Sequence, residues 1–145
     1  MECGCVQSNL FVGPGPSDEA DFDQLRAMGI TAILSLQTEE DVSSGGLQSR
    51  EKAAAQRGLV FRNVPVADFD RTQLRRRLRD CVATLDDLLK SGQVVYLHCT
   101  AGVSRSPTVA AAFLHWELGW RLDQAIAHLS TVRNCCPDAE IIREA

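Results

Sequence analysis

Short apolar runs alternate with amphipathic helical patterns along this chain. The runs at residues 10–12, 30–36, 59–66 and 94–97 are rich in β-branched and other apolar side chains, which favour strands. The last of them, VVYL, is apolar throughout, as in a strand buried on both faces of a sheet. This alternation predicts an α/β fold: a single domain with a central, mainly parallel (mixed) sheet of about four to five strands flanked by helices.

The first two predicted helices have clear end signals. One is expected at residues 18–28, with Ser17 as its N-cap and Gly29 at its end. The other is expected at residues 47–57, and a glycine follows it directly. The stretch at 38–46 between them is polar and contains glycine, so we predict a loop there.

Four further helices are predicted in the second half of the chain. A long helix begins near Arg71, carries leucines at helical spacing and ends before Gly92. Another has Pro107 in its first turn, and two shorter helices begin near Asp123 and Pro137. The buried stripe of the helix with Pro107 should include Val109, Phe113 and Trp116.

Length and charge limit the function classes. The chain has 145 residues, 45% of them hydrophobic, so we expect residues 1–145 to form one domain with an ordinary core. The net charge of −4 argues against nucleic-acid binding, and any anion site must therefore be local. No apolar run approaches the roughly 18 residues of a membrane span, and a signal-peptide pattern is lacking. We expect no membrane contact and a cytoplasmic or other soluble intracellular location.

The six cysteines show no disulfide framework or zinc-ligand spacing. C-x-C and C-C pairs are not the usual spacing of structural zinc ligands, so a site built from both ends of the chain is disfavoured. We expect reduced thiols and no metal or other cofactor. Packing is the expected role of Cys81, Cys135 and Cys136, and the alternative is a protective disulfide with Cys99 on oxidation.

The segment HCTAGVSRS, at residues 98–106, carries the clearest chemistry. It joins the predicted strand at 94–97 to the next helix, at the sheet edge where open α/β sheets bind ligands. Small side chains let backbone N–H groups converge on an anion, Gly102 adopts a conformation that other residues resist, and the helix dipole points the same way. Arg105 adds a planar fork that can hold two phosphate oxygens.

Cys99 lies at the floor of this predicted phosphate cradle. The groups that hold phosphate also stabilise a negative sulfur, so we expect a thiolate facing phosphorus. The alternative, a core cysteine near an unrelated surface arginine, does not explain why both occur with a glycine and small residues. His98, at the end of the strand, is expected to orient the loop through hydrogen bonds rather than to act as an acid or base.

The C-x5-R pattern, preceded by His and followed by Ser, resembles the signature of the protein tyrosine phosphatase superfamily, and CTAGVSRSP resembles its dual-specificity branch. The resemblance covers nearly the whole chain and implies a dual-specificity phosphatase catalytic domain. It implies attack by Cys99, a phosphocysteine intermediate, and help from the Ser106 hydroxyl when the thiolate departs. It also implies that phosphate is held by Arg105 and by the loop amides of Thr100, Ala101, Gly102, Val103, Ser104 and Arg105.

The resemblance and the mechanism both call for a general acid on another loop. Asp68 is our candidate, because it follows the strand at 59–66 and precedes the long helix, as the superfamily's acid-loop aspartate does. Asp70 is the rival, although its position next to the helix suits an N-cap better.

Substrate class stays open between a phosphorylated protein and a phosphorylated glucan. The stretches LSLQTEEDV, VADFDRTQLRRRL and HCTAG most resemble plant starch-excess glucan phosphatases, with a weaker similarity to laforin. That resemblance implies that Phe69 contacts the sugar chain, and lid packing is the alternative. Ser104 and Cys136 depart from the glucan pattern, and residues 37–58 contain no aromatic side chain.

Two other function classes share the loop. A catalytically silent phosphate-binding interaction module would use the same cradle, and the intact Cys99, Arg105 and Asp68 argue against it. A sulfur-transfer or arsenate-reducing enzyme would share the thiolate but has little need of Asp68 or Ser106. The five arginines between Arg71 and Arg79 form a solvated helix face or, alternatively, attract an acidic substrate.

Overall fold

A computed structural model describes residues 1–42 and 45–145. The described strands are β1 (Gly4–Gln7), β2 (Leu10–Gly13), β3 (Ala32–Ser35), β4 (Val60–Asn63) and β5 (Val95–His98). The described helices are α1 (Glu19–Ala27), α2 (Gly46–Gln56), α3 (Arg71–Lys90), α4 (Arg105–Trp116), α5 (Leu122–Val132) and α6 (Ala139–Glu144), together with a 3₁₀ helix, η1 (Glu39–Asp41).

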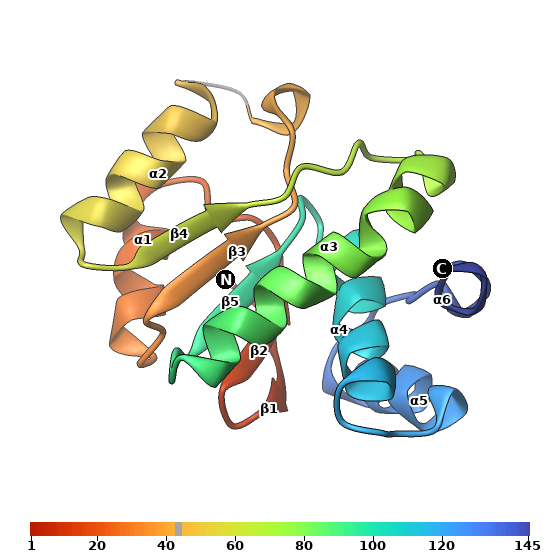
Figure 1. Cartoon of the computed structure of the whole chain (residues 1–145). Helices are drawn as coiled ribbons and strands as arrows, with labels where there is room; N and C mark the ends of the chain where they lie inside the picture. The colour runs from red at the N-terminus through yellow and green to blue at the C-terminus, as the bar shows by residue number, and fades with distance from the viewer. Residues whose placement is uncertain (43–44) are drawn as a thin grey trace.

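The five strands form one sheet in the order β1-β2-β5-β3-β4 (Figure 1). β2, β5, β3 and β4 are parallel to one another, and β1 pairs with β2 in the antiparallel direction. This is the mixed, mainly parallel sheet that the alternation of strands and helices predicted.

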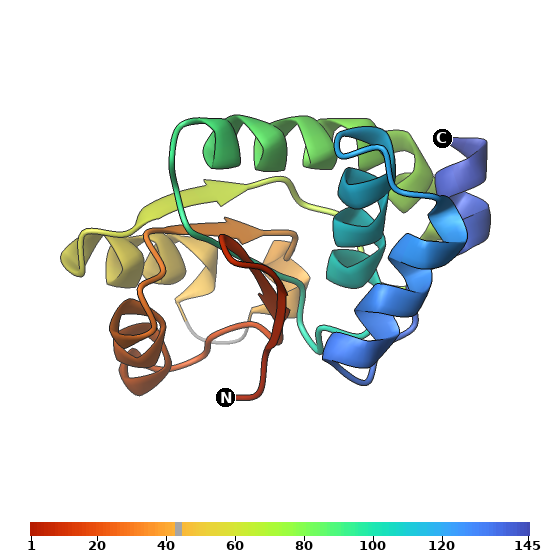
Figure 2. The same ribbon diagram turned by 90° about the horizontal axis from the view of Figure 1, so that it is seen from below.

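Helices cover both faces of the sheet (Figure 2). α1 and α2 lie on one face, where Phe22 and Leu25 of α1 and Ala54 of α2 pack with Ile33 and Tyr96 of the sheet. The larger core cluster lies on the other face, beneath α3, α4, α5 and α6. Because both faces are covered, the central strands are fully buried, which explains their continuous apolar runs.

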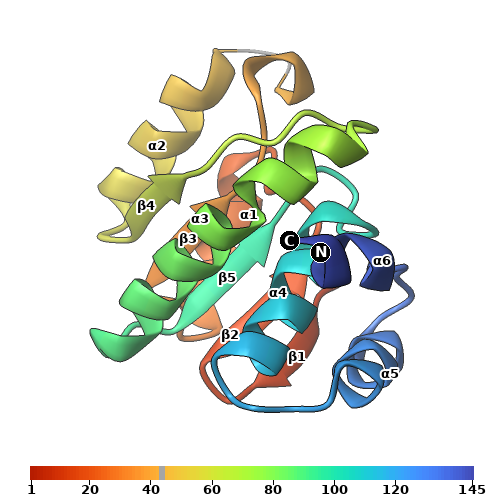
Figure 3. The same cartoon turned by 45° about the vertical axis from the view of Figure 1, so that its right-hand side comes forward.

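The parallel strands β3, β4 and β5 end at the same edge of the sheet (Figure 3). The chain leaves β3 into η1, leaves β4 toward α3, and leaves β5 into the turn before α4. Three loops from distant parts of the sequence therefore meet at the carboxyl edge, where the candidate phosphate cradle was expected.

The N-cap of α1 is a correction to the sequence analysis. Asp18, not Ser17, caps the helix, because the Asp18 carboxylate accepts the N–H of Asp21 at 2.9 Å. Ser17 donates its own N–H and hydroxyl to the Asp21 carboxylate. The expected helix end is present: Gly29 has φ +90°, and the next residue, Ile30, donates its N–H to the Leu25 carbonyl at 3.2 Å.

Strand β1 was not predicted. Its four residues begin with Gly4 and contain little β-forming sequence, so local propensity gives almost no signal. Pairing with β2 and a hydrogen bond at 2.8 Å between the His128 ring and the Val6 carbonyl hold it in place. Tertiary contacts therefore decide the conformation of this segment.

Two other strands and one loop differ from their predicted extents. β3 and β4 are shorter than the runs at 30–36 and 59–66, although Leu36 and Val66 still make backbone hydrogen bonds beside the sheet. The predicted loop at 38–46 contains η1 and the first residue of α2, and its residues 43–44 lie outside the described part of the chain. A short acidic 3₁₀ turn carries no apolar periodicity that would reveal it.

Helix α4 is buried on all sides over most of its length, not only along the one apolar stripe that was predicted. Its residues from Arg105 to Leu114 are all buried, because the sheet, α3 and α5 surround the helix. Val109 and Phe113 are buried as expected, but Trp116 is only half-buried, and the guanidinium of Arg79 lies 4.5 Å from its ring centroid. The central position of α4 fixes its N-terminal turn. This turn carries the end of the candidate phosphate loop, residues 99–105.

Candidate active site

Cys99 and Ser106 meet at the floor of a small cavity. Cys99 follows β5 directly and is only 2% exposed, and its Sγ lies 3.3 Å from the hydroxyl of Ser106 in the first turn of α4. The cavity has a volume of about 250 Å³, near the lower end of the range of small-molecule pockets. Its lining consists of Asp68, Phe69, Cys99, Ala101, Val103, Ser104 and Arg105.

The peptide carbonyls of the loop are tied to groups outside it. In a trans peptide, the carbonyl of one residue and the N–H of the next point in opposite directions, so a carbonyl held outward turns the next N–H inward. The Cys99 carbonyl accepts a hydrogen bond from the His98 ring (2.9 Å), and the Thr100 carbonyl accepts one from the Gly15 N–H (2.9 Å). The Val103 carbonyl accepts from the Cys136 N–H (2.7 Å), and the Ser104 carbonyl from the Thr108 hydroxyl (2.7 Å). The N–H groups that follow these carbonyls are therefore turned toward the cavity, an arrangement of the kind that can bind an anion.

Gly102 is required by the shape of the loop. It has φ +71°, and a Cβ atom there would lie 2.5 Å from the carbonyl carbon of Gly13. A larger residue would therefore push the loop away from the end of β2.

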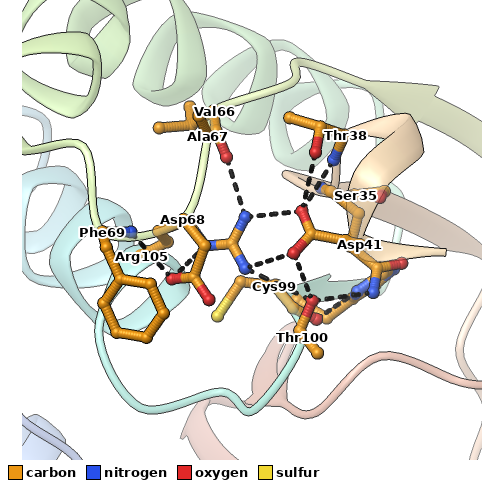
Figure 4. A network of polar contacts seen from close by, with 12 residues as sticks. Ser35, Thr38, Asp41, Val66, Ala67, Asp68, Phe69, Cys99, Thr100 and Arg105 are labelled. Carbon is orange, nitrogen blue, oxygen red and sulfur yellow. Dashed lines mark hydrogen bonds and ion pairs between the residues drawn. The ribbon is translucent and has the colours of Figure 1, made fainter.

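Arg105 is held over the cavity by several acceptors (Figure 4). Its Nη1 donates to the Asp41 carboxylate at 2.9 Å and to the Val66 carbonyl at 2.8 Å. Its Nη2 donates to the other Asp41 oxygen at 3.2 Å and to the Thr100 hydroxyl at 3.3 Å. The Nε atom lies 3.5 Å from an oxygen of Asp68. The guanidinium is thus fixed on its Asp41 side, while Nε lies toward Asp68, which lines the cavity.

Asp41 is a site residue that the sequence analysis missed. It ends η1, where its carboxylate also accepts the N–H and the hydroxyl of Thr38 at 2.9 and 3.1 Å. Burial alone would raise the pKa of Asp41, but hydrogen bonds led by that from Arg105 outweigh it and lower the pKa to about 2. The pattern T-x-x-D at residues 38–41 was the available signal, because it is typical of a capped turn.

Thr100 connects the two loops. Its hydroxyl donates to Asp41 at 3.0 Å and accepts from the buried Gln37 side chain at 3.2 Å. The segment after β3 therefore contacts the phosphate loop through side chains as well as through Arg105.

His98 is completely enclosed at the end of β5. Burial lowers its pKa to about 4, and the positive charge of Arg105 acts in the same direction. The ring is therefore neutral near pH 7, and its Nδ1–H is the donor to the Cys99 carbonyl. This contact is of the loop-orienting kind that the sequence analysis expected.

Asp68 and Asp70 take different positions. Asp68 lines the cavity, and its carboxylate is 41% exposed and accepts the Phe69 N–H at 3.1 Å. Asp70 is the N-cap of α3 and accepts the Gln73 N–H at 3.0 Å. The side chain of Gln73 in turn accepts the Ala67 N–H, which ties the loop to the first turn of α3.

Phe69 stands at the rim of the cavity. Its side chain is 98% exposed, and its backbone has φ +61°, in the left-handed region that non-glycine residues rarely occupy. In Figure 4 the ring lies beside Asp68, on the side away from Asp41. A ring this exposed does not pack in the core.

A family model described as "Dual specificity phosphatase, catalytic domain" matches residues 10–144. The chain belongs to this family. The dual-specificity phosphatase domain is 33% identical over 144 residues to "Phosphoglucan phosphatase DSP4, amyloplastic" of Castanea sativa, covering 97% of this chain and 38% of that protein. It is 34% identical over 135 residues to "Laforin" of Mus musculus, covering 84% of this chain and 41% of that protein. The chain thus spans about two fifths of the length of these two relatives.

Solved structures share the fold of this dual-specificity phosphatase domain. Cydia pomonella PTP-2 phosphatase has a TM-score of 0.79 at 22% identity, with 99% of this chain and 87% of that chain covered. Tk-PTP in its active form has a TM-score of 0.76 at 21% identity, with 98% and 91% covered. At these identities the likeness establishes the fold.

The arginines of α3 in this phosphatase domain mostly contact α6. Arg71 binds the Asp138 carboxylate at 3.0 Å, and Arg75 lies 3.9 Å from Glu144. Arg79 donates to the Ala145 carbonyl at 3.0 Å and stacks on Trp116. These three arginines contact α6 or the residues beside it, although all five arginines of the run are exposed.

The remaining cysteines lie outside the cavity. All six are free thiols; Cys81 and Cys135 are buried, while Cys136 is exposed and contacts the loop through its backbone N–H. Within residues 1–42 and 45–145, no group of three or more His, Cys, Asp or Glu side chains is arranged to hold a metal ion. No helix in that part of the chain is long and apolar enough to span a membrane.

Proposed function

We propose that this domain hydrolyses phosphomonoesters through a phosphocysteine intermediate. The Cys99 sulfur attacks phosphorus, the bond between phosphorus and the ester oxygen breaks, and Asp68 donates a proton to the leaving oxygen. Water then attacks the phosphocysteine, Asp68 accepts a proton from that water, and the phosphorus–sulfur bond breaks. The Ser106 hydroxyl stabilises the departing thiolate.

The observation that carries the proposal is the meeting of three groups in one cavity. Cys99, Arg105 and Asp68 come from two separate loops and line the same space of about 250 Å³. The loop amides and Arg105 would stabilise the charge on the three non-bridging phosphate oxygens, which is the largest electrostatic task in phosphoryl transfer. Membership of the dual-specificity phosphatase family supports the same chemistry.

We propose a phosphorylated glucan or a phosphorylated protein as the substrate. The exposed ring of Phe69 favours a sugar chain, because pyranose rings pack against flat apolar faces, and relatives named phosphoglucan phosphatases support this choice. The absence of aromatic residues between positions 37 and 58 favours a seryl, threonyl or tyrosyl ester in a protein.

The test measures phosphate release from three substrates in parallel: a phosphotyrosine peptide, a phosphothreonine peptide and phosphorylated amylopectin. Cys99→Ser is the blank, because a hydroxyl at this position is a far weaker nucleophile. We expect the wild type to release phosphate and Cys99→Ser to release none. Absence of release from all three, with bound phosphate detected by calorimetry, would instead establish a phosphate-binding interaction module.

The same assay separates the substrate classes. A glucan substrate would be assigned if phosphate is released faster from amylopectin than from the peptides, and if Phe69→Ala slows release from amylopectin but not from the peptides. Preference for a peptide, unchanged by Phe69→Ala, would assign a phosphoprotein substrate.

A further inference from the structure

Arg133 reaches the phosphate loop from outside the proposed catalytic residues. It is the C-cap of α5, where the backbone becomes extended, and its guanidinium lies between residue 2 and the phosphate loop. Its Nη2 donates to the Ala101 carbonyl at 3.2 Å, and its Nη1 donates to the Glu2 carbonyl at 2.8 Å. Nothing in the C-x5-R pattern indicates this residue.

The bond to Ala101 controls one particular peptide. A carbonyl of Ala101 held outward places the N–H of Gly102 on the opposite side, toward the anion. Rotation of this peptide changes ψ of Ala101 and φ of Gly102. Glycine adopts positive and negative φ about equally well, so this rotation meets little steric resistance from the backbone.

The neighbouring peptides are restrained in other ways. Rotation of a peptide that precedes a non-glycine residue forces that residue toward positive φ, which is costly. The Val103 and Ser104 carbonyls are also bound, by the Cys136 N–H and the Thr108 hydroxyl. The peptide before Gly102 is therefore the part of the loop that most needs a bond from outside.

We propose that Arg133 is a positioning residue that keeps the Gly102 N–H directed at the bound phosphate. It acts through the Ala101–Gly102 peptide and does not touch the substrate. The inference rests on the proposed phosphate site and adds a residue that prepares it before the anion arrives. Without the Arg133 guanidinium, the Ala101–Gly102 peptide can rotate. The Ala101 carbonyl oxygen, the negative end of the peptide dipole, can then face the phosphate.

The test compares Arg133→Met with Arg121→Met. Both changes remove one arginine at an end of α5, but the Arg121 side chain is 74% exposed and pairs only locally with Asp123. Tungstate binding by calorimetry reports the anion site without turnover, and kcat/KM for para-nitrophenyl phosphate reports catalysis. Thermal unfolding of each variant establishes that it is folded at the assay temperature.

We expect Arg133→Met to weaken tungstate binding about tenfold and to lower kcat/KM by about 10²-fold, the size found when one oxyanion donor is removed. Arg121→Met should stay within about twofold of the wild type. The difference between the two variants should persist from 0.1 to 1 M salt, because a peptide orientation is not screened, whereas long-range attraction is screened beyond roughly 3 Å at 1 M.

Equal tungstate affinities in the two variants would overturn the inference, as would a difference that vanishes at 1 M salt. If Arg133→Met does not fold, Arg133→Leu, which also lacks a donor, takes its place with the same criteria. Tungstate binding without any phosphate release would contradict the proposed hydrolysis alone. Failure of the wild type to bind tungstate would overturn both proposals.

Discussion

Among single residues, Asp41 and Arg105 show how a loop outside the signature segment prepares the site. Their side chains are 9% and 4% exposed, and among the ion pairs within residues 1–42 and 45–145 this is the one in which both partners are less than 10% exposed. A buried cation that loses its partner is strongly destabilising, because its desolvation is no longer compensated. Asp41 therefore contributes to both the fold and the orientation of the guanidinium.

We expect Asp41→Asn to lower the free energy of unfolding by about 3 kcal/mol and kcat/KM by at least about tenfold. The amide keeps one acceptor for Arg105 but loses the charge and the second acceptor oxygen. Urea unfolding and steady-state kinetics measure the two effects. The matched control is Asp123→Asn, which breaks an exposed pair with Arg121 and should change stability by less than about 0.5 kcal/mol. Similar stabilities of the two variants would contradict this role.

The two acid-loop aspartates should separate kinetically. We expect Asp68→Asn to lower kcat by about 10²- to 10⁴-fold on an alkyl phosphate, whose leaving oxygen needs a proton, and much less on an aryl phosphate with a good leaving group. Asp70→Asn should retain activity within about threefold, because asparagine is also a good N-cap for α3. A large loss in Asp70→Asn with an active Asp68→Asn would reverse the assignment.

The residues of the phosphate loop could be predicted because they are contiguous in sequence and their spacing has one clear chemical purpose. Asp41 lies 64 positions before Arg105, and only the folded sheet brings the two together. Arg133 and Gly15 were missed for the same reason, since each contacts the loop from a distant segment.

At the level of secondary structure, α6 depends on its first residue and on its contact with α3. Asp138 caps α6, accepts from Arg71 at the start of α3, and donates its N–H to Thr108 of α4. The hydrogen bond from Arg71 holds the pKa of the Asp138 carboxyl below its ordinary value. One residue thus links three helices beside the active site.

We expect Asp138→Ala to lower the free energy of unfolding by about 1–2 kcal/mol, because it removes both the cap and the ion pair. Asp138→Asn keeps the cap and loses only the charge, so its loss should be under about 1 kcal/mol, as for a partly exposed pair. Chemical denaturation of both variants measures the difference. Equal losses in Asp138→Asn and Asp138→Ala would show that the ion pair, not the cap, dominates.

Elements were predicted where periodicity was strong and missed where packing decides. α3 carries leucines at helical spacing over five turns and begins and ends where expected. β1 has no such pattern, and the choice of Asp18 over Ser17 as the cap of α1 depends on side-chain geometry that two adjacent capping residues do not reveal.

For the molecule as a whole, acid sensitivity should arise at the active-site edge. Burial lowers the pKa of His98 to about 4 in the folded protein. As the pH drops from about 6.5 to about 4, this histidine is protonated in the unfolded chain before it is protonated in the folded one, so the free energy of unfolding falls. Asp41 has its pKa lowered to about 2, so its contribution is present above about 3.8 and is lost as the pH falls toward about 2. Both groups destabilise the fold in acid, in successive ranges.

We expect the free energy of unfolding to fall by on the order of 3 kcal/mol over the His98 range and by about 2 kcal/mol more over the Asp41 range. Urea unfolding at half-unit steps of pH measures the profile. His98→Gln should remove the upper part, and Asp41→Asn the lower part. A profile that stays flat between pH 6.5 and 4 would contradict the buried, neutral state of His98.

The bonds around the phosphate loop also bear on the order in which the chain is synthesised. Gly15 and the residues near Cys136 hold the loop from its two sides, so the loop is enclosed by segments made first and segments made late. When Cys99 has just left the ribosome, the segment near Cys136 has not yet been released and cannot bind the loop. The Cys99 thiol is then accessible to oxidants and chaperones until about forty more residues leave the ribosome. The enclosure of Cys99 would then coincide with completion of the domain, and not with synthesis of the motif that contains it.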